Sequence, residues 1–198
     1  DPTLSFAVAR VLGGIAFSLG LILVVIAGAE LFTGNNLRVM AWADKKITTG
    51  ELLRNWSVVY VANAIGALGL AVIVYLSNHG AMSGGAVAAK YIQIAQAKLS
   101  LPFAEAFFKA VLCNLLVCLA VWLALAGRSV TDKILAIVFP ISAFVAAGFE
   151  HSIANMYFVP VALFIKNYAP ATFWELIGKT PTDFASVTWG AFFLNNLI

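Results

Sequence analysis

The same polar pattern interrupts two long apolar stretches of this chain. Residues 28–35 and residues 148–155 both read G-x-E-x4-N, and each places a glutamate, Glu30 or Glu150, within an otherwise apolar run. A charge at the centre of a bilayer costs at least about 2.5–3.5 kcal/mol, so such a residue usually faces a cavity or a partner. Polar interruptions at corresponding positions of two halves are typical of transporters that are built from repeats. The repeated pattern therefore favours transport across a membrane.

Composition indicates a membrane protein. Hydrophobic residues make up 62% of the 198 residues and charged residues 11%, and the mean hydropathy is +0.95. A soluble domain of this length cannot bury so much apolar surface. The net charge of +3 is small and scattered, so we expect no nucleic-acid partner. Several uncharged runs approach the ~20 residues of a spanning helix. These runs cover residues 11–29, 57–78, 110–127, 134–149, 152–165 and 184–198.

Two segments are too long for one span. As single helices, residues 11–37 would measure about 40 Å and residues 134–165 about 48 Å, against a hydrocarbon core of about 30 Å. Each segment carries the repeated motif, and we therefore predict two broken helices, in which an irregular turn separates two helical halves. Irregular backbone at membrane depth is stable only where protein or a water-filled cavity covers it. The two turns should consequently lie inside the protein, beside a pathway.

A second repeat agrees with the first. Trp56 precedes Asn63 by seven residues, and Trp189 precedes Asn196 by seven, each at the start of the span that follows a predicted break. The repeat unit is then a helix, a broken helix and a helix. We predict six spans for the whole protein, of which this chain lacks the first and most of the sixth.

We interpret residues 1–198 as part of a single transmembrane pore domain of the all-α class. Residues 1–78 would form the first repeat without its first helix, residues 79–100 an outer loop, and residues 101–198 the second repeat with a shortened last helix. Within the outer loop, the spacing of apolar residues predicts an amphipathic helix over residues 85–98. Its apolar positions are Val87, Tyr91, Ile94 and Ala95.

Three segments resemble signatures of the formate–nitrite transporter family. They are residues 27–34 (AGAELFTG), 113–120 (CNLLVCLA) and 148–156 (GFEHSIANM), and the resemblance extends over essentially the whole chain. It is closest to the bacterial formate channels. The resemblance implies an aquaporin-like inverted repeat with broken second and fifth spans, assembled as a homopentamer in a bacterial cytoplasmic (inner) membrane. It also implies one pore per protomer for formate or similar small anions, a surrounding lipid bilayer and no cofactor.

The resemblance places His151 at the centre of the pore, paired with Thr33. From the residues alone, a lone histidine among apolar neighbours is usually a core residue, and Thr33 could cap a helix. An imidazole, however, can hold or offer a proton near neutral pH. An anion crosses an apolar tube at high cost and the neutral acid at low cost, so a proton or strong hydrogen bond from His151 would lower the barrier. The hydroxyl of Thr33 would fix the histidine tautomer or touch the substrate.

The resemblance also implies hydrophobic constrictions above and below the histidine, which would exclude hydrated ions. Apolar residues at helical spacing are otherwise most often core residues, so the resemblance alone selects these positions. The implied constriction residues are Phe17, Leu21, Leu31, Val117 and Phe144.

Charged and polar residues complete the implied site. Lys98 matches a lysine of the outer vestibule, where a low-dielectric funnel would attract anions, although a surface lysine is usually just solvated. Asn114 matches a polar residue of the fourth span, with interhelical hydrogen bonding as its alternative. Glu30 and Glu150 would repel an anion in the pore, so we predict that they accept backbone N–H groups at their breaks. The residues that would complete those turns are Asn35 and Asn155.

These features predict a channel or transporter for small monovalent anions, most simply formate, with or without a proton. Nitrite and hydrosulfide carriers of the same family share the pore residues and stay open as alternatives. An aquaporin-like pore for neutral solutes would show Asn-Pro-Ala turns at both breaks, and neither break has one. A membrane enzyme would need further titratable groups or metal ligands near His151, where only Glu150 and Glu30 are available. We therefore predict neither catalysis nor a metal site.

Overall fold

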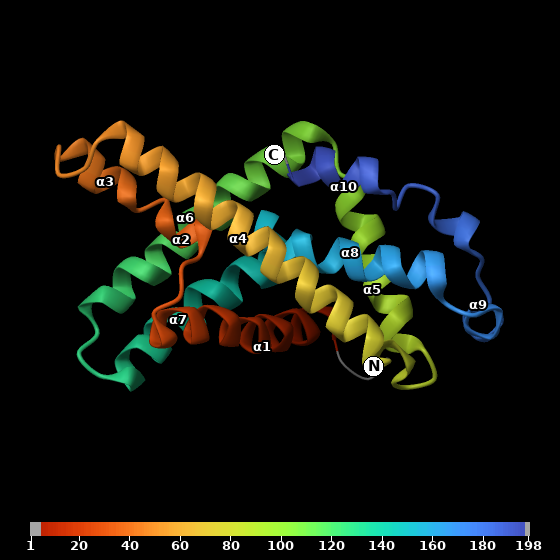
Figure 1. Ribbon diagram of the computed structural model, residues 1–198. Coiled ribbons are helices and arrows are strands. Elements are labelled where there is room, and N and C mark those ends of the chain that lie inside the picture. The colour runs from red at the N-terminus through yellow and green to blue at the C-terminus, as the bar shows by residue number, and fades with distance from the viewer. Residues whose placement is uncertain (1–4, 197–198) are drawn as a thin grey trace. The chain divides into compact units, whose positions relative to one another are not determined.

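The computed structural model describes residues 5–196, and within that range every regular element is a helix. Figure 1 shows the elements along the chain. They are α1 (Phe6–Ala27), α2 (Phe32–Asn35), α3 (Arg38–Ala43), α4 (Thr49–Leu76), η1 (His79–Ala81), α5 (Ala86–Leu99), α6 (Phe103–Ala126), α7 (Val130–Ala147), α8 (Ser152–Tyr168), α9 (Ala171–Ile177), η2 (Pro181–Phe184) and α10 (Trp189–Asn196). The predicted all-α class is confirmed. By length and composition, α1, α4, α6 and α7 could each cross a membrane.

Both predicted helix breaks are present, and a glycine ends the first half of each. Gly28 follows α1 with φ 71° and ψ 29°, and Gly148 follows α7 with φ 75° and ψ 34°. Glycine adopts this left-handed conformation without the steric cost that a Cβ imposes. In each case the residue after the glycine donates its N–H to a carbonyl five residues back, Val24 at 2.9 Å and Phe144 at 3.1 Å. The motif glycine is therefore the residue that terminates each half-helix.

The second halves of the two broken helices differ in length. After the first break, α2 has four residues and α3 begins a new helix at Arg38, whereas α8 continues for 17 residues after the second break. Leu31 is the N-cap of α2 and His151 is the N-cap of α8. Thr33 lies inside α2, so the alternative in which Thr33 caps this half-helix is wrong.

The chain divides into two compact units. The first contains the residues up to Val61 together with Phe108–Glu150, and the second contains Ala62–Phe107 together with the residues from His151 onward. The first break therefore lies within the first unit. At the second break, the first unit ends at Glu150 and the second unit resumes at His151, the N-cap of α8.

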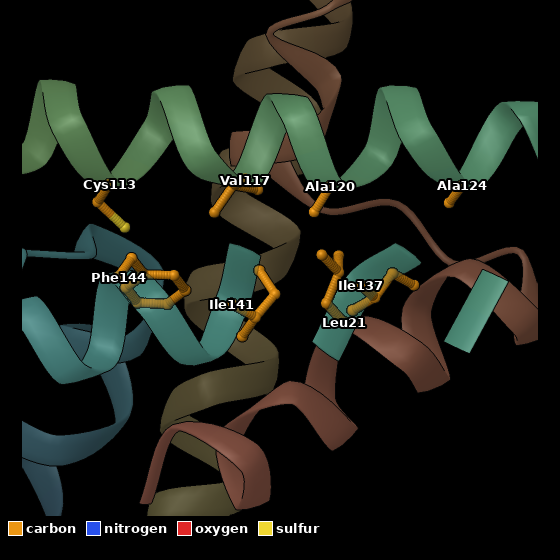
Figure 2. Packing of buried hydrophobic residues seen from close by; sticks show 8 residues of the cluster. All are labelled: Leu21, Cys113, Val117, Ala120, Ala124, Ile137, Ile141 and Phe144. Atoms are coloured by element: carbon orange, nitrogen blue, oxygen red, sulfur yellow. The ribbon is translucent and has the colours of Figure 1, made fainter. Parts of the chain in front are cut away.

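Helices α1, α6 and α7 share the hydrophobic core of the first unit, which Figure 2 shows from close by. α1 packs along α7, and the backbones of the two helices lie close together at Gly14. A Cβ at Gly14 would lie 2.7 Å from the Cα of Ser142, so only glycine fits there. The buried core residues are Leu21, Cys113, Val117, Ala120, Ala124, Ile137, Ile141 and Phe144.

In the second unit, α8 packs against α5 and α10. The amphipathic helix predicted over residues 85–98 is confirmed as α5. Its buried residues, however, are Ala88, Ile92 and Ala95. Ala95 is a predicted position, whereas Ala88 and Ile92 each lie one residue after a predicted position. Tyr91 lies at the edge of the buried side because its hydroxyl group makes a 2.9 Å hydrogen bond with the hydroxyl group of Tyr157 on α8.

Candidate functional site

The first break is held by amide side chains from two other helices. Asn114 on α6 donates from Nδ2 to the carbonyl oxygen of Thr33 at 3.1 Å, and its Oδ1 accepts from Asn36 Nδ2 at 3.1 Å. Asn114 therefore holds the backbone of α2 at Thr33 and the side chain of its C-cap, Asn36. The interhelical hydrogen bonding that the sequence left open for Asn114 is present. Thr33 itself is buried.

The motif residues of the first break bond to each other and to the following span. Asn35 donates from Nδ2 to Glu30 Oε2 and, at 2.9 Å, to Asn55 Oδ1 on α4. Trp56 donates its indole N–H to the carbonyl oxygen of Asn35 at 3.1 Å. Asn35 is thus bonded to the carboxylate of its own motif, and the prediction that it completes the turn stays a prediction. The predicted bond from Glu30 to backbone N–H groups stays a prediction.

All five predicted constriction residues lie in one hydrophobic cluster of the first unit. Leu21, Val117 and Phe144 are buried core residues, and Figure 2 labels each of them. Phe17 and Leu31 pack against this core. The rings of Phe17 and Phe144 meet edge to face, with centroids 5.6 Å apart and planes at 88°. Convergence of these side chains from α1, α6, α7 and the first break suits both a core and a constriction, so the constriction stays a prediction.

His151 begins α8 and caps it. The residue is buried, its backbone is extended, and its Nδ1 accepts the backbone N–H of Ala154 at 3.1 Å. In a neutral imidazole one nitrogen accepts and the other donates, so this bond leaves the proton on Nε2. Sequence reasoning missed the capping role because Ser, Thr, Asp and Asn are the usual N-caps. Its position directly after a break and before a helix was the available signal.

Asn155 repeats in the second unit what Asn35 does in the first. Its Nδ2 donates to Asn195 Oδ1 on α10 at 2.8 Å, as Asn35 donates to an asparagine of the span that follows. Asn195 in turn donates to the carbonyl oxygen of Lys98, in the last turn of α5, at 3.4 Å. Sequence reasoning did not identify Asn195. Lys98 is half-buried and Asn155 is buried.

The predicted site residues thus fall into two groups. Thr33, Asn114 and the five apolar residues belong to the first unit with Glu150, which is buried, whereas His151, Asn155 and Lys98 belong to the second. The pairing of Thr33 with His151 stays a prediction. Within residues 5–196, no group of three or more His, Cys, Asp or Glu side chains could hold a metal ion.

Comparison with known proteins gives consistent matches. A family model described as "Formate/nitrite transporter" matches residues 2–198. The formate channel FocA of Escherichia coli (strain K12) is 43% identical over 196 residues, which cover 99% of this chain and 69% of the relative. A probable formate transporter of Methanothermobacter thermautotrophicus is 41% identical, over 93% of this chain and 66% of the relative.

Two solved structures resemble the fold. One, described as a pentameric formate channel with formate bound, has a TM-score of 0.93 and 44% identity, and the match covers 98% of this chain and 76% of that chain. The other, an FNT family ion channel, has a TM-score of 0.71 and 31% identity over the same shares of the two chains.

Proposed function

We infer, from the premise that the chain belongs to the formate/nitrite transporter family, that it is a multi-pass membrane channel or transporter for small monovalent anions. Formate is the proposed substrate, because one relative is named a formate channel and the solved relative with a TM-score of 0.93 is described with formate bound. The observation that carries the proposal is the pair of glycine-ended breaks, the second of which leads directly into buried His151. Broken helices are where transporters place their binding groups.

We propose that a passing anion meets His151. Because Nδ1 accepts the N–H of Ala154, the neutral ring offers its Nε2–H to a carboxylate oxygen. With a proton on Nδ1, the N–H of Ala154 would face another N–H group and the capping hydrogen bond would be lost. Such a cap is worth about 0.5–2 kcal/mol. The capping bond therefore supports hydrogen-bond donation to formate as the less costly route and proton delivery as the more costly one.

We assign supporting roles to the other predicted residues. The apolar cluster around Phe17 and Phe144 would constrict the pore and exclude hydrated ions. Lys98 would raise the local anion concentration at the outer entrance. Thr33, whose backbone is fixed by Asn114, would present its hydroxyl to the anion or to the histidine.

We further propose that the protein is a homopentamer in the cytoplasmic (inner) membrane of a bacterium. The solved relative described as pentameric supports this assembly, since it shares 44% of its aligned residues with this chain. An exposed apolar stripe along α6 supports the membrane location, because lipid or a neighbouring protomer must cover such side chains. The exposed residues of this stripe are Val111, Leu115, Leu119 and Trp122.

Uptake into proteoliposomes tests the function. Purified protein should admit isotopically labelled formate much faster than protein-free liposomes do, and parallel measurements with nitrite and hydrosulfide rank the alternatives. Labelled glycerol is the matched neutral solute, and we expect it to be excluded. Formate uptake at the protein-free rate, or glycerol uptake that exceeds it, would contradict the proposal.

A further inference from the structure

A chain of side-chain amides connects three helices of the second unit. Asn155 on α8 donates to Asn195 Oδ1 at 2.8 Å, and Asn195 on α10 donates to the carbonyl oxygen of Lys98 on α5 at 3.4 Å. A single amide group therefore accepts from one helix and donates to another. α10 packs against both α5 and α8, and Figure 1 shows these three helices close together.

The two outer ends of this chain are the positions that the proposed function uses. Asn155 lies one turn after His151, and its N–H donates to the carbonyl oxygen of His151 at 3.0 Å. At the other end, the carbonyl that accepts from Asn195 belongs to Lys98 itself. Asn195 thus joins the helix that the histidine begins to the turn that carries the lysine.

Two further bonds fix the segment on which Asn195 lies. Gln96, in the last turn of α5, donates to the carbonyl oxygen of Asp183 at 3.2 Å. Lys166, in the last turn of α8, donates to the carbonyl oxygen of Val187 at 2.9 Å. The side chains of Phe184, Val187 and Phe192 are buried along the same segment. The segment from Asp183 to Asn195 is therefore held to the last turn of α5 and to the last turn of α8 by hydrogen bonds and by buried side chains.

We propose that Asn195 is a positioning residue for anion entry. It holds the last turn of α5, and with it Lys98, in a fixed place relative to the first turn of α8. Without this amide, α5 would keep the bond from Gln96 and the bond between Tyr91 and Tyr157, but its last turn would lose the link that runs from Lys98 through Asn195 to Asn155. The ammonium group of Lys98 would then occupy a wider range of positions, and its average attraction for an anion at the entrance would fall. This inference rests on the proposed function, since it assigns a role relative to Lys98 and His151.

The test compares formate uptake by the full-length protein in proteoliposomes for the wild type, Asn195→Ala and Lys98→Ala. We expect Asn195→Ala to raise the formate concentration of half-maximal uptake roughly two- to tenfold at low ionic strength, the range for loss of one hydrogen bond. Maximal uptake should change little. The difference should shrink as salt screens the lysine over a Debye length of about 8–10 Å. The double variant should be no worse than Lys98→Ala alone.

Control variants distinguish a positioning role of Asn195 from a general effect on the stability of the protein. Asn167 is an exposed amide on α8, and Asn167→Ala should leave the formate concentration of half-maximal uptake unchanged. If Asn195→Ala fails to assemble, Asn195→Ser decides, because its hydroxyl keeps the position polar but is too short to join Asn155 to the carbonyl of Lys98. Wild-type half-saturation in either well-folded variant, or an effect that adds to that of Lys98→Ala, would overturn the inference. A wild-type protein without formate uptake would instead refute the proposed function, and the role of Asn195 with it.

Discussion

The two motif glycines have nearly the same backbone conformation but different surroundings, which allows a matched prediction. An alanine at either position must adopt φ above +70°, at a cost of about 1–2 kcal/mol that is common to both. At Gly28 a Cβ would meet nothing within 4 Å. At Gly148 it would collide with the guanidinium group of Arg10.

The excess cost at Gly148 follows from what Arg10 does. Its Nε donates to the carbonyl oxygen of Ala146 at 3.2 Å, at the end of α7, where a positive charge also suits the helix dipole. A net hydrogen bond from a charged group is worth about 1.5–3 kcal/mol. The guanidinium is the end of a flexible side chain, so loss of this bond sets the upper limit of the excess cost. Gly148→Ala should therefore lower the free energy of unfolding more than Gly28→Ala does, by up to about 3 kcal/mol.

Equilibrium unfolding in detergent mixtures of increasing SDS content, followed by tryptophan fluorescence, measures these differences. Gly13→Ala is the reference, because Gly13 lies within α1 with open space around it, and alanine there should stabilise the helix by about 0.5–1 kcal/mol. In a double-mutant cycle, Arg10→Ala should add little to Gly148→Ala but its full cost to Gly28→Ala. Equal destabilisation at the two motif glycines, or additive effects at Gly148, would refute the reasoning.

Three further predictions address assembly and transport. Native mass spectrometry in mild detergent should show a pentamer, and a monodisperse monomer or tetramer would contradict the proposed assembly. Lys98→Ala should slow formate entry most at low ionic strength, over the Debye length of about 8–10 Å, and a salt-independent loss would indicate a structural lysine. His151→Asn should leave the assembly intact and flatten the pH dependence of formate flux, because an amide keeps a hydrogen-bond donor but does not titrate. Wild-type pH dependence in a well-folded His151→Asn protein would leave His151 as a packing residue.

The helix breaks could be predicted because they depend on local chemistry and on length. A glycine and a glutamate within an apolar segment longer than the bilayer leave few alternatives to an interrupted helix. The length of the second halves could not be predicted in the same way. α2 stops after four residues where Asn35 and Asn36 turn to partners on α4 and α6, Asn55 and Asn114. Those partners are distant in sequence, so the local spacing of apolar residues cannot identify them.

The same limit applies to side chains that were assigned from spacing. The bond to Asn155 is made by Asn195, a residue that neither repeated motif marks. Successive side chains of a helix point about 100° apart, and only packing decides which side of the helix faces its neighbour. The buried side of α5 differed from the prediction by one residue for the same reason, since the bond between Tyr91 and Tyr157 keeps that ring at the edge. The pairing of Thr33 with His151 and the division into sequence repeats are still predictions.

The two copies of the G-x-E-x4-N motif share some hydrogen bonds and differ at one position. In both copies the glycine ends a helix, and the asparagine seven residues later donates to an asparagine of the following span, at 2.9 Å from Asn35 and 2.8 Å from Asn155. These shared residues have a structural role, because they join each broken helix to the span that follows it. The N-cap position between them is where the copies differ: it is Leu31 in the first and His151 in the second. One copy therefore supplies an apolar side chain to a hydrophobic cluster, and the other supplies an imidazole whose Nδ1 caps the helix that follows. The two copies are alike in how they join a broken helix to its neighbour and differ in the chemistry of the N-cap.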